Sequence, residues 1–236
     1  MIEFMELYDL FKKDYCISFN NNSQQNIVFF GNCQIVPIAY YLNYITQKYN
    51  IHIILSWVFQ KEGFEFFNME AVNNKINLLV KNCDILIYHK HFTNYGINAD
   101  IIEKIPAGVV INIPNLQMHY TETTLENCYA SIHKLEESII ESDFKNFKFL
   151  LNYKTILFFN TNVHPTHFVL YLLTLQICYK ILNIKREITL EDYYSPLNRK
   201  FFKKIKQHII LPGKVGIKRD FCEKAQILFP PDYFDI

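Results

Sequence analysis

The chain has 236 residues, of which 50 % are hydrophobic and 16 % aromatic, enough apolar surface to bury the core of one sizeable domain. Its 24 basic and 23 acidic side chains balance, so the overall charge argues against a nucleic-acid-binding protein. We expect a single α/β domain over residues 1–236, in which an N-terminal helix and polar connector (1–25) precede an α/β core (26–117) and a helical part (118–236).

The six cysteines are widely and irregularly spaced, which argues against a Cys-x-x-Cys pair and against a compact disulfide framework. The first residues carry acidic side chains and no long apolar core, a pattern unlike that of a signal peptide. The most apolar run, residues 168–182, is too short and too polar to cross a bilayer comfortably. The sequence therefore predicts a cytoplasmic protein with reduced thiols.

Strand-like and helix-like segments alternate through the first half of the chain. Helical spacing of apolar residues predicts a helix over 2–14, and the polar stretch 19–25 predicts a connector. Four strand-like runs follow: NIVFFG (26–31), IHIILSWVF (51–59), DILIYHK (84–90) and GVVINIPN (108–115). Helices are expected up to about 49, near 70–82, near 98–104, and later around 131–146, 164–183 and 196–211. This order predicts a parallel-type sheet with flanking helices, on which a mostly helical C-terminal half packs.

The first strand-like run ends in Gly31-Asn32-Cys33-Gln34, directly before helix-forming sequence. In open α/β sheets, ligands bind beyond the carboxyl ends of the strands. Pro37 suits the first turn of a helix, which places the helix start near Gln34, with Cys33 at its tip and Gly31 at a sharp turn. At such a tip the helix dipole favours a thiolate nucleophile, and amides are placed to hold an oxyanion. A buried structural cysteine is an equal alternative.

Histidines follow the third strand-like run. On a strand, His89 and His91 would point the same way at the expected ligand edge. Such a pair can bind a metal, but no carboxylate or cysteine of matching placement accompanies it, so we expect no metal site. After the fourth run, Asn115 is able to hydrogen-bond a sugar or an amide, or else Pro114-Asn115 forms a simple turn.

A second helix start of interest lies in NVHPTHFVLYLL. Pro165 suits the first helical position, which makes His164 the expected N-cap. Near the positive end of a helix dipole an imidazole stays neutral and can accept a proton, so His164 is a candidate general base. The alternative is a histidine that only caps the helix, and His167 either contacts substrate or packs. If Cys33 and His164 lie close together, they form a Cys/His pair.

Between residues 193 and 219 there are eight basic side chains and no acidic one. Ser195 and Pro196 predict a capped helix in which Phe201, Ile205 and Ile209 form the buried stripe. Its outward lysines either form a solvated face, or bind phosphates, or contact anionic lipid at the inner face of a membrane.

The motifs FFGNCQ, INIPNLQMHY and TNVHPTHFVLYLL, in this order and spacing, resemble the WcbI-type family of bacterial capsule polysaccharide biosynthesis, over residues 26–182. The resemblance implies binding of coenzyme A in a groove and transfer of an acetyl group to a capsule sugar. Gly31-Asn32-Cys33 also looks like the Gly-Asp-Ser block of SGNH-type esterases, with cysteine in place of serine, although no Asp-x-x-His appears near the C-terminus. His89 stands where the family resemblance leads us to expect glutamine.

The resemblance therefore implies a coenzyme A-dependent O-acyltransferase that modifies a sugar of capsular or other surface polysaccharide. The expected catalytic residues are Cys33, His164, Asn32 and Gln34, and the expected substrate contacts are His89, Asn115 and His167. The expected coenzyme A contacts are Gly31 and, from the basic segment beyond the resemblance, Arg199 and Lys203. Two alternatives are a glycan- or nucleotide-binding component of the same pathway without catalysis, and a thiol-dependent esterase. The expected partners are an acyl-coenzyme A donor and a sugar acceptor, with no nucleic acid.

Overall fold

The computed structural model describes residues 16–55, 69–89, 109–116, 125–144 and 165–205. The predicted helices over 2–14 and 98–104 lie outside these ranges. The chain divides into two compact units, Met1–Ile113 with Lys203–Ile210, and Pro114–Phe202 with Leu211–Ile236. The expectation of a single domain over 1–236 stays a prediction.

The first unit contains a five-stranded mixed sheet in the order β1-β3-β2-β4-β5. Its strands are β1 (Ile17–Phe19), β2 (Asn26–Gly31), β3 (Asn50–Leu55), β4 (Ile85–Tyr88) and β5 (Val109–Asn112). β2 lies at the centre, parallel to β3 on one side and to β4 on the other, and β4 is parallel to β5. β1 pairs antiparallel with β3 at one edge.

All four strands predicted from the sequence are present, and the α/β class is confirmed. The parallel-type sheet needs one correction, since β1 is antiparallel and contains Phe19, the first residue of the predicted connector. A strand of three residues is too short to show the alternation of apolar and polar side chains on which strand prediction depends.

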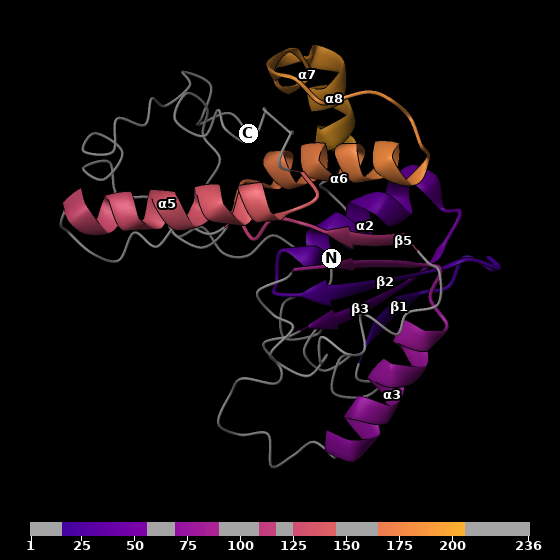
Figure 1. Ribbon diagram of the computed structural model, residues 1–236. Coiled ribbons are helices and arrows are strands. Elements are labelled where there is room, and N and C mark those ends of the chain that lie inside the picture. The colour runs from indigo at the N-terminus through magenta and orange to yellow at the C-terminus, as the bar shows by residue number, and fades with distance from the viewer. Residues whose placement is uncertain (1–15, 56–68, 90–108, 117–124, 145–164, 206–236) are drawn as a thin grey trace. The chain divides into compact units, whose positions relative to one another are not determined.

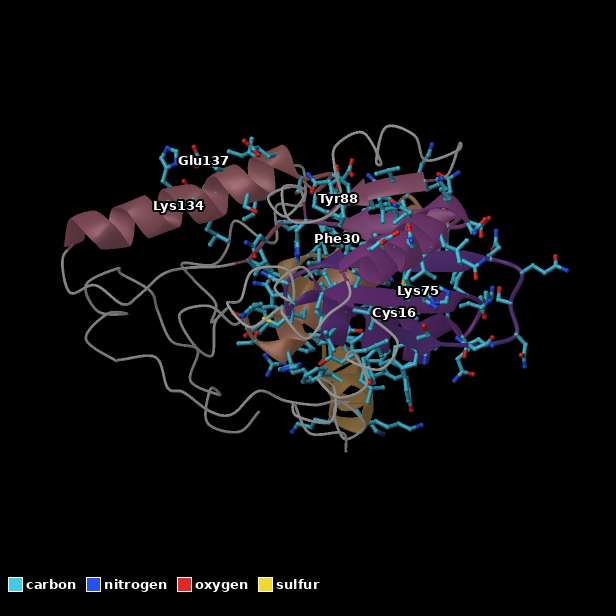
Figure 2. The ribbon with its side chains drawn as sticks, turned by 90° about the horizontal axis from the view of Figure 1, so that it is seen from below. Cys16, Phe30, Lys75, Tyr88, Lys134 and Glu137 are labelled. Atoms are coloured by element: carbon cyan, nitrogen blue, oxygen red, sulfur yellow. The ribbon has the colours of Figure 1, made fainter. Side chains whose placement is uncertain are left out.

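Both faces of the sheet are buried. On one face, Val28, Phe30 and Leu86 belong to a core cluster that includes Ile76 and Val80 of helix α3 (Met69–Lys81). Figure 2 labels Phe30 and Tyr88 of this face, Cys16 just before β1, and Lys75 on α3. Helix α2 (Ile35–Thr46) lies on the opposite side of the sheet from α3, as Figure 1 shows.

The face toward α2 is equally apolar. Ile27, Phe29, Ile53 and Ile87 alternate with the residues of the α3 face, and each has no exposed surface. Strands that are buried on both faces appear in a sequence as continuous apolar runs, which is why NIVFFG and DILIY were recognisable as strands.

The two helical crossovers of the parallel strands run in opposite directions across the sheet. From β2 the chain passes through α2 to β3, and from β3 it returns through α3, past β2, to β4. Because parallel crossovers are right-handed, two crossovers in opposite directions place their helices on opposite faces. The carboxyl ends of β2 and β4 are thus the point at which the order of the strands reverses, where open α/β sheets form their ligand crevice.

Polar side chains brace the opposite, amino-terminal end of the sheet. Asn50 Oδ1 accepts from the backbone N–H groups of Asn21 at 3.0 Å and Ser23 at 3.2 Å, and its Nδ2 donates to the Ser23 carbonyl at 2.7 Å. The backbone N–H of Asn26 donates to Asp84 Oδ2 at 2.7 Å. These bonds hold the β1–β2 connection against the starts of β3 and β4.

The second unit is helical where it is described. Its helices are α5 (Leu125–Glu141), α6 (His167–Ile181), α7 (Leu190–Tyr194) and most of α8 (Pro196–Ile205). The predicted segment 131–146 therefore begins earlier, and α7 was not predicted. Within the described ranges, none of the helices combines the length and the apolar character needed to span a membrane.

The start of α6 differs from the prediction. The N-cap is Thr166, whose Oγ1 accepts from the backbone N–H of Val169 at 3.3 Å. His164 is therefore not the cap, and Pro165 precedes the helix instead of opening it. A threonine side chain offers a better acceptor at this position than an imidazole two residues further back.

The start of α8 agrees with the prediction. The helix begins at Pro196, and Ser195 Oγ accepts from the backbone N–H of Asn198 at 3.4 Å. In the buried stripe, Ile205 is fully buried as expected, but Phe202 is more buried than Phe201. Ile209 lies outside the described residues.

Candidate functional site

The connection between β2 and α2 is a short turn held by local hydrogen bonds. Asn32 Oδ1 accepts from the backbone N–H of Gln34 at 2.9 Å, and the Asn32 carbonyl accepts from the N–H of Ile35 at 3.2 Å. The Cys33 carbonyl accepts from the N–H of Val36 at 3.3 Å. Gln34 is the N-cap, so Cys33 lies at the helix tip, as predicted.

Cys33 is partly exposed, whereas its neighbours Asn32 and Gln34 are buried, at 5 % and 2 % exposure. Burial raises the pKa of the Cys33 thiol to about 11, and a hydrogen bond to the backbone lowers it by less. The expected stabilisation of a thiolate by the helix tip is therefore outweighed by the cost of placing a charge among buried groups. At neutral pH the side chain is a thiol, which needs a base to become a nucleophile.

The predicted oxyanion site at this turn depended on the Gln34 amide and the Asn32 side chain. These two groups bond to each other, with the amide of Gln34 donating to Asn32 Oδ1. An oxyanion could take this amide only if the Asn32 side chain moved aside. Asn32 and Gln34 thus stabilise the turn in this structure.

His89 directly follows β4 and is fully buried. Its backbone N–H donates to the Phe30 carbonyl at 3.1 Å, which extends the pairing of β4 with β2 by one residue. The prediction placed His89 at the ligand edge as a substrate contact, but its side chain has no exposed surface in this structure. A fully buried side chain cannot touch a ligand unless its surroundings open.

Gly31 is the last residue of β2 and lies beside His89. A Cβ atom on Gly31 would lie 2.3 Å from His89 Nδ1 and 2.9 Å from Ile35 Cγ2. Gly31 therefore supplies room for a neighbouring ring, and the sharp turn that was predicted for it belongs to the residues after it.

The turn that carries Cys33 and the residue His89 thus lie at the carboxyl ends of adjacent strands, where the strand order reverses. Comparisons with protein-family models, with curated proteins and with solved structures find no match. The functional argument therefore rests on this chain's own residues.

Other predicted site residues belong to the second unit. His164 lies outside the described residues. His167 is the first residue of α6 and is buried, at 8 % exposure. Asn115 is half-buried, and its backbone N–H donates to Ser138 Oγ at 2.8 Å. This bond ties the backbone of Asn115 to α5, and the Asn115 side chain stays a candidate substrate contact.

The two predicted phosphate contacts have different surroundings. The Arg199 guanidinium lies 5.6 Å from the ring centroid of Phe168 and 5.2 Å from that of Tyr193, and its Nε donates to the Tyr193 carbonyl at 3.1 Å. Arg199 therefore joins α6, α7 and α8. Lys203 is exposed and remains available for a phosphate.

In the ranges that the structure describes, no group of three or more His, Cys, Asp or Glu side chains is placed to hold a metal ion. His91, the second histidine of the predicted pair, lies outside those ranges. Cys16, Cys33, Cys83 and Cys178 are thiols that form no disulfide.

One polar pair was missed by the sequence analysis. Ser18 on β1 and His52 on β3 are cross-strand partners, and Ser18 Oγ lies 2.9 Å from His52 Nδ1. Burial, and then the charge of Lys75, lowers the pKa of His52. Because β1 was not predicted as a strand, the sequence carried no signal that would have brought these two side chains together.

Proposed function

We propose that this chain is a coenzyme A-dependent O-acyltransferase that modifies a sugar hydroxyl of a capsular or other surface polysaccharide. The observation that carries the proposal is the position of Cys33. Cys33 is a partly exposed residue beyond the carboxyl end of the central strand, at the reversal of the strand order. The family resemblance of the three sequence motifs supplies the substrate class.

In the proposed reaction, Cys33 carries the acyl group. His164 takes the thiol proton, and the sulfur attacks the thioester carbonyl of acyl-coenzyme A. The bond to the coenzyme A sulfur breaks, and that sulfur leaves with the proton from His164. The sugar hydroxyl then attacks the acyl-Cys33 thioester and gives its proton to His164, which returns it to the departing Cys33 sulfur. The products are coenzyme A and an O-acylated sugar.

The raised pKa of Cys33, about 11, makes a base necessary for this route. In the proposal the helical C-terminal half folds onto the sheet, and this brings His164 to Cys33. His167 and Asn115 then contact the acceptor sugar, and Lys203 contacts a phosphate of coenzyme A.

Mass spectrometry of the protein after incubation with acetyl-coenzyme A tests the covalent step. We expect an acetyl adduct on the peptide that contains Cys33, lost in Cys33→Ser and formed much more slowly in His164→Ala. Cys83→Ser is the matched control, since burial also raises the pKa of Cys83 to about 11. Absence of an adduct, together with no rise in melting temperature when coenzyme A is added, would contradict the proposal.

A second candidate function is binding of a glycan or nucleotide without catalysis. The hydrogen bond that occupies the Gln34 amide favours it, and so does burial, which raises the pKa of the Cys33 thiol. A binding component would show a ligand-induced rise in melting temperature for both the wild type and Cys33→Ser, and acyl transfer by neither. The covalent enzyme would lose transfer and keep coenzyme A binding in Cys33→Ser.

A further inference from the structure

We infer that His89 is a positioning residue for Cys33: its buried ring fills the space that Gly31 leaves at the end of β2, and so fixes the turn that presents the thiol. The importance of Cys33 in this inference rests on the proposed function. The packing of His89 against the turn rests on the geometry of the sheet alone.

The first step is the reason for glycine at position 31. Its φ is not in the left-handed region, so any residue could adopt its backbone conformation. What a side chain would lack is space, since a Cβ atom would lie 2.3 Å from His89 Nδ1 and 3.1 Å from His89 Cε1. Gly31 and His89 are therefore complementary in size.

The second step is that the ring has little freedom to move. His89 has no exposed surface, and its backbone is tied to Phe30 by the 3.1 Å hydrogen bond that continues the β2–β4 pairing. In a close-packed interior, a ring in this position yields only if its neighbours rearrange. A flexible side chain beside Gly31 could move away from an added Cβ atom. The His89 ring cannot, so it limits the space at Gly31.

The third step connects the ring to the thiol. Ile35, the first residue of α2, is fully buried. Its Cγ2 lies 2.9 Å from the position that a Cβ atom on Gly31 would take. Only Asn32, Cys33 and Gln34 separate Gly31 from Ile35. Gly31 and Ile35, at the two ends of this three-residue connection, thus both lie close to the space that the His89 ring fills. This packing limits the positions that Cys33 can take.

The consequence is that His89 controls how deeply Cys33 is buried. Loss of the ring would leave a cavity beneath the turn, and a looser turn would admit water to the sulfur. Since burial is the main cause of the raised Cys33 pKa, that pKa should fall from about 11 toward its ordinary value of 9.0.

Alkylation by iodoacetamide across a range of alkaline pH, read by mass spectrometry at Cys33 and Cys83, tests the inference without coenzyme A. In His89→Ala we expect Cys33 to react about tenfold faster at pH near 8 and its titration midpoint to fall, while Cys83 is unchanged. Cys83 is buried in the same unit and has a similarly raised pKa, so it reports any general loosening. The control Ile87→Val, on β4 two residues before His89, should leave both rates unchanged.

Two results would overturn the inference: equal acceleration of Cys33 and Cys83 in His89→Ala, which indicates general unfolding, or no change at Cys33. A second measurement uses melting temperatures. Gly31→Ala should be strongly destabilised or insoluble, and the double variant Gly31→Ala/His89→Ala should recover, because the added methyl group then has room. Additive losses in the double variant would contradict size complementarity.

These measurements separate the inference from the proposed function. A protein in which His89→Ala selectively frees Cys33 but acetyl-coenzyme A leaves no adduct on Cys33 would retain the positioning role and lose the acyltransferase. An adduct on Cys33 that forms at the same rate in the wild type and His89→Ala, with unchanged alkylation, would retain the acyltransferase and remove the positioning role.

Discussion

Arg199, a predicted phosphate contact, also holds neighbouring parts of the protein together. Its guanidinium contacts two aromatic rings and one carbonyl, so its removal should lower the free energy of unfolding. We expect Arg199→Ala to cost about 1–3 kcal/mol, from two cation–π contacts and a charged hydrogen bond. Denaturant unfolding measures this loss, with the exposed neighbour Lys200→Ala as control. Unchanged stability of Arg199→Ala together with lost coenzyme A affinity would contradict this structural role and favour the phosphate-binding role.

The alkylation rate of Cys33 should depend on pH. Burial disfavours its charged form, so the reactive thiolate is scarce at neutral pH and increases as pH rises through about 11. We expect the alkylation rate of Cys33 in the wild type to rise about tenfold per pH unit from neutral pH, without a plateau near pH 7. A plateau near neutrality would mean that a base or an anion-stabilising group lowers the pKa in solution.

At the scale of the helices, the Thr166 cap is the feature that differs most from the sequence prediction. Thr166 Oγ1 satisfies an amide in the first turn of α6 that otherwise has no partner within the helix. Thr166→Ala should lower the stability by about 1 kcal/mol, and Thr166→Ser, which keeps the acceptor, should change it little. Thermal or denaturant unfolding of the three proteins checks this. Equal losses for alanine and serine would mean that the methyl group, and not the hydroxyl, matters.

The proposed contacts with coenzyme A phosphates can be tested on the exposed lysines of α8. Lys200, Lys203 and Lys204 are all exposed on this helix, and Leu197 beside them is 75 % exposed. If these lysines hold phosphates of coenzyme A, charge reversal in Lys203→Glu should weaken coenzyme A binding at least about fivefold. Lys81→Glu, on α3, is the control. Calorimetry measures the affinity, and co-sedimentation with anionic lipid vesicles shows whether a membrane surface is the ligand instead.

How much of these elements the sequence predicts depends on the length of the pattern. The apolar runs of β2 and β4 were recognisable because strands buried on both faces consist almost wholly of apolar residues. β3 and β5, which are less completely buried, were recognisable because they are rich in β-branched residues. The Ser195 cap was recognisable because Pro196 follows it. The three residues of β1 carry no pattern. Pro165 pointed to His164 as the cap of α6, whereas the cap is Thr166, one residue after the proline.

At the scale of the whole molecule, the sequence indicated the alternation of strands and helices but not the order of the strands. The placement of Cys33 at the central strand, and of His89 on the strand beside it, follows from that order. The burial of His89 could not be predicted either, since a histidine at the end of a strand is equally compatible with solvent exposure. Its contact with Gly31 depends on the register between β2 and β4, which single-sequence patterns do not report.

The stability of the sheet should depend on pH through His52. Its pKa is lowered from the ordinary value of 6.5 by burial and by Lys75, so protonation is harder in the folded state than in the unfolded one. The contribution of neutral His52 to the free energy of unfolding is therefore complete above pH 6.5, and it is lost as the pH falls through the pKa of the folded state. We expect stability to decrease as the pH falls below 6.5, and to decrease less in His52→Gln. Melting temperatures across this range measure the difference, and equal acid sensitivity of both proteins would contradict it.

The short antiparallel strand β1 also covers the outer edge of β3. Ile17, Ser18 and Phe19 pair with Ile53, His52 and Ile51, so the outer amides and carbonyls of this part of β3 already have partners. Without β1, that row would become a template for strands of neighbouring copies, and the apolar run of β3 would make the contact persistent. Deletion of Ile17–Phe19 should therefore yield a chain that self-associates into larger sheets. A polar tag placed well before Cys16 should leave the protein monodisperse.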